Sequence, residues 1–169
     1  MRSVYRKVKQ KFPYVNVCIW NTSILNEFMI HQPFQFFTLV EVESEAARSV
    51  FYFLKESERH VFLEPKKEML SDYLPESGHA LIVNSLVSEA PLQTIGNVVT
   101  ATLEKVLVDL FCAPSLFYTY QGAELTTIFK EAFSKYTVNE NRLLRYADRR
   151  GKKNKLDHYL KVNKLSAVN

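Results

Sequence analysis

Two acidic segments carry the residue types of a metal-dependent catalyst. Glu41 and Glu43 alternate along a predicted strand, so their side chains lie on the same face of it. Glu64 and Lys66 follow at the end of the next predicted strand, and nucleases of the restriction-enzyme type use this combination to hold Mg²⁺ and orient water. Pro65 argues against this use, because proline removes a ladder hydrogen bond and bends a strand. A Mg²⁺-dependent nuclease is therefore kept as the alternative hypothesis.

The common catalytic signatures are absent from the sequence. It contains no phosphate-binding glycine motif, no G-x-S-x-G, no H-E-x-x-H and no C-x-x-C. The histidines are isolated from one another, which is typical of surface or hydrogen-bonded histidines rather than metal ligands; they are His31, His60, His79 and His158. We therefore expect no metal, no cofactor and no enzymatic activity.

The most basic stretch, "NENRLLRYADRRGKKNK" at 139–155, is the leading candidate for a binding surface. At about 100° per residue, one face of the predicted helix is basic with a tyrosine in it, and Leu143, Leu144 and Ala147 face the other way. The candidate contact residues are Arg142, Arg145, Tyr146, Arg149, Arg150, Lys152 and Lys153. Arginine binds two phosphate oxygens at once, so the stretch predicts contact with nucleic acid or an acidic partner. Alternatively, some arginines act as clamps onto the acidic body of the same chain.

The charge distribution bears on this choice. The net charge of +4 combines two basic ends with an acidic middle. Such a distribution is informative about partners but not about fold.

The segment "TLEKVLVDLF" contains the other carboxylates of interest. Glu104 falls in the first turn of a predicted helix, where a negative charge is favourable. Lys105 and Asp109 are spaced as an i,i+4 ion pair. These structural roles are sufficient to explain both acidic residues.

The pattern of apolar residues predicts the elements that must position these groups. Helices are expected at 3–11, 21–31, 44–56 and 66–74, and strands at 14–20, 34–43, 60–65 and 79–87, with a hairpin at 92–102. From residue 102 onward the pattern is helical, and Thr137 and Glu140 have the spacing of a capping box. The fold class is α/β (α+β): a mixed sheet with flanking helices over the N-terminal two-thirds, partly parallel, followed by a helical C-terminal part.

Size and composition are those of one globular domain. The 169 residues predict a single domain over 1–165, with an α/β part at about 1–101 and a helical part at about 102–160. Cys18 and Cys112 are expected to be buried free thiols in a reducing compartment. No apolar run reaches the ~18–20 residues that span a bilayer, and no secretory signal is present, so we expect a cytoplasmic protein without membrane contact.

Three segments carry a resemblance to a known family. "TLEKVLVDLF", "QGAELTTIFKEAF" and "YTVNENRLLRYADRRGKK" resemble the C-terminal domain of AbiEi-type proteins, the antitoxins and transcriptional regulators of type IV abortive-infection toxin–antitoxin systems. Residues 17–43 are similar to the α/β half of that domain. The signature residues are Thr102, Glu104, Lys105 and Asp109, and Arg142, Arg145, Arg149 and Arg150 form the basic surface.

The resemblance implies an antitoxin-like function whose genetic partner is a nucleotidyltransferase-like toxin. It also implies an N-terminal winged helix that binds promoter DNA, and no such segment precedes residue 1 of this sequence. The resemblance assigns no catalytic role to the signature residues. A purely structural or oligomerisation module is the further alternative.

Overall fold

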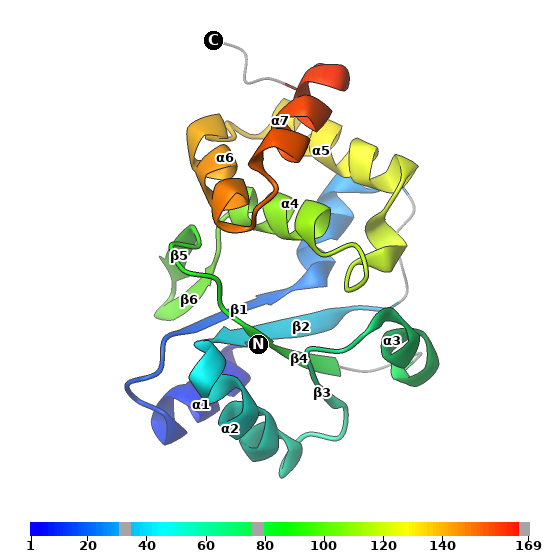
Figure 1. The fold of residues 1–169 in the computed structure, drawn as a ribbon. Coiled ribbons are helices and arrows are strands. Elements are labelled where there is room, and N and C mark those ends of the chain that lie inside the picture. Colours follow the sequence, from blue (N-terminus) through cyan, green and yellow to red (C-terminus); the bar gives the residue numbers. More distant parts are fainter. Residues whose placement is uncertain (31–34, 76–79, 166–169) are drawn as a thin grey trace. The chain divides into compact units, whose positions relative to one another are not determined.

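A computed structural model describes residues 1–30, 35–75 and 80–165 of the chain (Figure 1). It is a mixed α/β fold, which confirms the predicted fold class. The chain divides into two compact units, which we call the sheet unit and the helical unit. The sheet unit comprises Met1–Ile24, Pro33–Leu86 and Leu92–Thr100, and the helical unit comprises Leu25–Gln32, Val87–Pro91 and Ala101–Asn169. The predictions for His31 and His79, and for the ends of the strands expected to begin at 34 and 79, lie outside the described residues.

The sheet unit contains a four-stranded sheet in the order β1-β2-β4-β3. Its strands are β1 (Val17–Asn21), β2 (Phe37–Val42), β3 (Val61–Leu63) and β4 (Ala80–Ser85). β1 pairs with β2 antiparallel, whereas β4 pairs with β2 and β3 in parallel, so the predicted partly parallel pairing is confirmed. All of β2 and the first four residues of β4 are buried, which is typical of strands that are covered on both faces.

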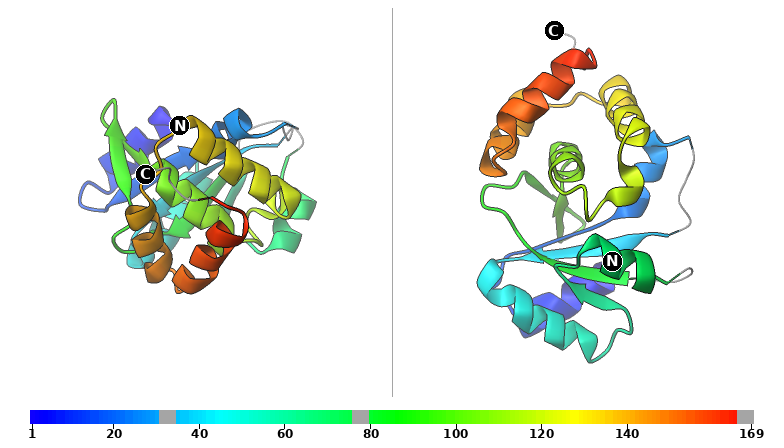
Figure 2. Two further views of the ribbon diagram at one scale, coloured as in Figure 1. Left: turned by 90° about the horizontal axis from the view of Figure 1, so that it is seen from above. Right: turned by 45° about the vertical axis from the view of Figure 1, so that its right-hand side comes forward.

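Two helices cover one face of this sheet. α1 (Arg2–Lys11) and α2 (Ser44–Lys55) lie on the same side of it in both views (Figures 1 and 2). Val4 and Val8 of α1 and Val50 and Leu54 of α2 are buried in one cluster with alternate residues of the strands, among them Val40. The remaining elements are α3 (Lys67–Tyr73) and a hairpin of β5 (Leu92–Ile95) and β6 (Val98–Ala101).

The hairpin turns where the sequence predicts it. Gly96 and Asn97 both have positive φ, +54° and +65°. Two consecutive positive φ values are the requirement of a type I′ turn, which Gly and Asn meet with little strain.

The helical unit is built around α4 (Leu103–Cys112). The other helices are α5 (Ala123–Lys135), α6 (Glu140–Arg149) and α7 (Lys153–Val162), with a short 3₁₀ turn at η2 (Tyr118–Tyr120). The 3₁₀ segment η1 (Thr22–Phe28) begins in the sheet unit and ends in the helical unit. Viewed along its axis, α4 lies between α5 on one side and the α6–α7 pair on the other (Figure 2). Every residue from Glu104 to Leu110 is buried, so α4 is the core helix of this unit. Within the described parts of the chain, none of the helices has the length and apolar character needed to cross a membrane.

Candidate functional site

Helix α4 carries charged residues into the interior of the helical unit. Thr102 is its N-cap and its hydroxyl oxygen accepts a hydrogen bond from the backbone N–H of Lys105, which explains why the helix begins at Leu103. Lys105 is completely buried, and Glu104 and Asp109 are 7% and 3% exposed. Ionised groups at this depth are tolerated only when they are paired.

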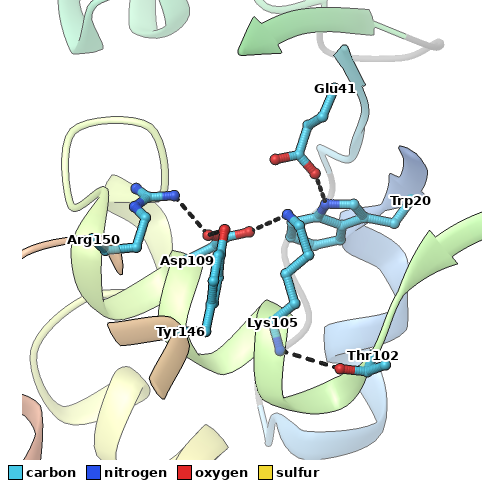
Figure 3. A network of polar contacts seen from close by, with 7 residues as sticks. All are labelled: Trp20, Glu41, Thr102, Lys105, Asp109, Tyr146 and Arg150. Carbon is cyan, nitrogen blue, oxygen red and sulfur yellow. Dashed lines mark hydrogen bonds and ion pairs between the residues drawn. The ribbon is translucent and has the colours of Figure 1, made fainter. Parts of the chain in front are cut away.

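Asp109 is the centre of a buried ion-pair network (Figure 3). Its Oδ2 lies 2.5 Å from Lys105 Nζ on the same helix, which confirms the predicted i,i+4 pair. Its Oδ1 accepts hydrogen bonds from Arg150 Nη1 at 2.7 Å and from the Tyr146 hydroxyl at 3.0 Å. The Lys105 ammonium also lies 5.9 Å from the centre of the Tyr146 ring. One carboxylate therefore joins α4 to both Tyr146 and Arg150 of the α6 region.

The charge of Arg150 is compatible with its surroundings. Burial opposes its positive charge, but the neighbouring Asp109 carboxylate outweighs burial with the help of Tyr146 and Cys112, so the pKa of Arg150 is raised above its ordinary value. The guanidinium therefore stays charged and remains a strong partner for Asp109.

Glu104 makes the second attachment between α4 and α6. Its Oε1 accepts a hydrogen bond from the backbone N–H of Asn139 at 3.0 Å. Asn139 is the N-cap of α6, and its side chain accepts from the backbone N–H of Arg142 at 2.9 Å. The predicted capping box at Thr137 is therefore wrong, because Asn139 lies directly before the helix and its side chain accepts the free N–H of Arg142. Glu104 holds the start of α6, and Asp109 holds its end.

The end of α6 is a Schellman turn. Gly151 has φ +64°, its N–H donates to Asp148 O, and the N–H of Lys152 donates to Ala147 O, both at 2.8 Å. This closed turn leads directly into α7 at Lys153. The helix pair α6–α7 is thus connected by a short, hydrogen-bonded link.

The structure divides the predicted contact residues of α6 into two groups. Arg142, Arg145 and Arg149 are exposed, as predicted, and so is Lys153 at the start of α7, while Lys152 is half-buried. The predicted outward position of Tyr146 is wrong, because this residue is 1% exposed and turned toward Asp109. Arg150 likewise turns inward. We define the α6–α7 basic surface by the exposed residues Arg142, Arg145, Arg149, Lys153 and Lys155.

Two arginines of the basic stretch pair with carboxylates of the same chain, as the clamp hypothesis predicts, but these carboxylates do not belong to the sheet. Arg150 pairs with Asp109 of α4, and Arg149 pairs with Glu89 of the segment before β5. Both partner carboxylates belong to the helical unit and neither lies on a strand of the sheet. The side chains of Arg142 and Arg145 make no ion pair among the described residues.

The residues of the nuclease hypothesis are not brought together in one site. Glu41 accepts a hydrogen bond from Trp20 Nε1 at 3.0 Å in the interior, a contact between residues 21 positions apart that no local pattern predicts. Glu43 lies past the end of β2 and accepts from Asn16.

The other two residues of that hypothesis follow β3 in the chain. Glu64 lies past the end of β3 and accepts from the Ser85 hydroxyl at 2.7 Å, and Lys66 is the exposed residue before α3. Within 1–30, 35–75 and 80–165, no three His, Cys, Asp or Glu residues are grouped so that they could hold a metal ion. The nuclease hypothesis stays a prediction that these contacts do not support.

The reactivity of Cys112, the last residue of α4, tests how well the end of this helix is shielded from solvent. Burial raises the pKa of its thiol from 9.0 to about 11, against the opposing effect of the Arg150 charge. Since the thiolate is the reactive species, we expect iodoacetamide to label Cys112 at pH 8 about a hundredfold more slowly than in the unfolded chain, and faster as the pH rises toward 11. Peptide mass spectrometry separates Cys112 from Cys18, and the same chain in urea is the control. Labelling at the unfolded rate at pH 8 would contradict the burial of Cys112.

Comparison with known proteins adds the family. The fold and the network define a mixed α/β protein whose core helix α4 holds α6 through buried charges. Residues 1–166 match the model of DUF6577, described as a family of unknown function, and the chain belongs to this family. Searches of curated proteins and of solved structures gave no match.

Proposed function

We propose that this chain is an antitoxin-like domain of the AbiEi type that acts by binding and not by catalysis. Its partner carries negative charge and is nucleic acid or an acidic protein, bound at the α6–α7 basic surface. The genetic partner is a nucleotidyltransferase-like toxin, and the site of action is the cytoplasm. The proposal starts from the sequence resemblance and is supported by the arrangement of the residues that carry it.

The observation that carries the proposal is the attachment of α6 at both ends. Glu104 and Asp109 come from one signature segment, and Tyr146 and Arg150 come from the "RYADRRG" segment. These segments are far apart in the sequence, yet Asp109 contacts both Tyr146 and Arg150, and Glu104 contacts the residue that caps α6. The two signatures therefore have a common role, which is to hold α6 in one orientation.

That orientation determines which residues meet a partner. Leu143, Tyr146 and Ala147 are buried, so Arg142 and Arg145 project from the outer face. A charge that is already held in place loses less conformational freedom when it binds. Rigid presentation of unpaired arginines is the property expected of a binding surface for phosphate or carboxylate groups.

Co-expression with the toxin tests the function. We expect the wild-type chain to restore growth to cells that express the neighbouring nucleotidyltransferase-like protein. The variant with Arg142→Glu and Arg145→Glu should lose this rescue, because it places negative charge where the partner binds. A matched control with Arg48→Glu and Lys130→Glu changes the net charge equally at exposed positions outside α6 and α7 and should keep the rescue.

Two results would count against the proposal in different ways. Failure of rescue both by this chain and by a longer version that includes any coding sequence upstream of Met1 would refute the antitoxin function. Full rescue by the Arg142→Glu, Arg145→Glu variant, at equal protein level, would instead remove the α6–α7 basic surface from the mechanism.

A further inference from the structure

The α6–α7 pair has a construction that narrows the class of partner. Two short helices are joined by a three-residue turn, Arg150 to Lys152, that is closed by the Schellman hydrogen bonds around Gly151. Leu156 and Leu160 of α7 are buried, as are Leu143 and Ala147 of α6. The pair is therefore anchored on its inner side along both helices. The exposed basic residues of both helices are presented on a supported scaffold.

Basic residues outnumber acidic ones on the outer side, where Asp148 is the exposed acid of α6. Four basic side chains are exposed there and make no ion pair among the described residues, namely Arg142, Arg145, Lys153 and Lys155. The pairs of Arg149 with Glu89 and of Lys161 with Asp157 take two further cations out of this group. Between these cations, the first turns of α7 expose Asn154 and His158, which are one helical turn apart. Polar groups flanked by cations suit a partner with a charged backbone and hydrogen-bonding edges.

The positions of the aromatic residues indicate whether a nucleic-acid partner is single-stranded or double-stranded. Proteins that bind single strands stack the bases on exposed aromatic rings. The aromatic residues of α6 and α7 are Tyr146, His158 and Tyr159, and the two tyrosines are turned inward. Tyr146 bonds to Asp109, and the Tyr159 ring packs 5.3 Å from Phe111 and 5.4 Å from Phe129. His158 is then the one exposed aromatic ring of this helix pair, and a single ring is no platform for stacking successive bases.

The shape of the α6–α7 helix pair favours duplex DNA over duplex RNA as the partner. An α-helix enters the major groove of B-form DNA, whereas the major groove of A-form RNA is too deep and narrow for it. A pair of helices joined by a short glycine-containing turn is also the construction that places a second helix in the DNA groove. We infer that the α6–α7 basic surface binds double-stranded DNA, with arginines and lysines on the phosphates and the first turns of α7 toward the bases. This rests on the proposed function only in using the same surface.

The test measures binding by the purified full chain, with no toxin present. The probe is a fluorescent 24-base-pair duplex DNA of mixed sequence, read by anisotropy at 50–200 mM salt. Four phosphate contacts predict a slope of log affinity against log salt of about −4, which is roughly a hundredfold loss over this range. The variant with Arg145→Glu and Lys153→Glu should bind at least tenfold more weakly with a slope reduced in size by about 2, and the Arg48→Glu, Lys130→Glu control should bind as the wild type.

Three competitors decide the class of partner. They are duplex RNA and single-stranded DNA of the same sequence, and poly-glutamate. Equal or tighter binding of any of these three, or absence of duplex DNA binding at 50 mM salt, would overturn the inference. Rescue of growth without DNA binding would leave the proposed function in place and remove this inference, whereas DNA binding without rescue would do the reverse. Unchanged denaturation midpoints of the variants establish that they are folded.

Discussion

Replacing Asp109 with alanine is expected to destabilise the protein by about 3–5 kcal/mol, because it leaves buried positive charge without its carboxylate. The substitution takes away the carboxylate that Lys105 and Arg150 share and the acceptor of the Tyr146 hydroxyl. Lys105 has no exposed surface, so its ammonium cannot regain hydration without disrupting the core. Urea denaturation followed by circular dichroism measures the loss as a shift of the midpoint.

The exposed pair Asp157–Lys161 supplies the matched control. It has the same residue types at the same i,i+4 spacing, but its lysine side chain is 73% exposed. Exposed pairs contribute about 0.2–1 kcal/mol, so Asp157→Ala should shift the midpoint only slightly. Equal shifts for Asp109→Ala and Asp157→Ala would contradict a network that depends on burial.

Much of the fold follows from local pattern in the sequence. The alternation of helical and strand patterns up to residue 87 predicts the α/β order, and the largely apolar composition of β2 and β4 agrees with their central positions. The antiparallel pairing of β1 could not be predicted in this way. An apolar strand has the same periodicity whichever direction its neighbour runs.

The burial of Lys105 is indicated by the apolar residues around it in the sequence. The i,i+4 spacing of Lys105 and Asp109 does not by itself indicate burial. Around Lys105 and Asp109, the residues Val106, Leu107 and Val108 and then Leu110 and Phe111 cover every side of α4 with apolar groups. A helix that is apolar all round is a buried helix. A charged pair within such a helix is therefore expected inside, where it must find further partners.

No pattern in the sequence predicts which distant residues Glu104 and Asp109 contact. Glu104 meets Asn139, and Asp109 meets Arg150, across 35 and 41 residues of sequence. Only the packing of α6 on α4 brings these groups within hydrogen-bonding distance. The resemblance singled out both segments but could not show that they contact each other.

The predicted outward face of α6 differs from the observed one by about a quarter turn of the helix, although the residues themselves indicate the correct face. Centring the wheel on Arg142 puts Tyr146 and Arg150 at the edge of the basic face. The positions Leu143, Tyr146, Ala147 and Arg150 fit the i, i+3, i+4, i+7 template, and this is the face that the structure buries. Arg150 belongs to this inward face, although a charged residue is not typical of a buried face.

The two neighbouring leucines of α6 test this corrected orientation. Leu143 is completely buried, whereas Leu144 is only half-buried. Leu143→Ala is therefore expected to destabilise the protein by about 2–5 kcal/mol, because it removes buried apolar groups and leaves a cavity between α6 and α4. Leu144→Ala loses less buried surface and leaves no enclosed cavity, so about 1 kcal/mol is expected.

The comparison is internally controlled, since both variants remove the same atoms from the same helix and change helix propensity equally. Denaturation midpoints with unchanged slopes give the two free-energy losses directly. A larger loss for Leu144→Ala would rotate the core face of α6 by about 100° and would free Tyr146 from Asp109. The α6–α7 basic surface would then lose the orientation on which its binding role depends.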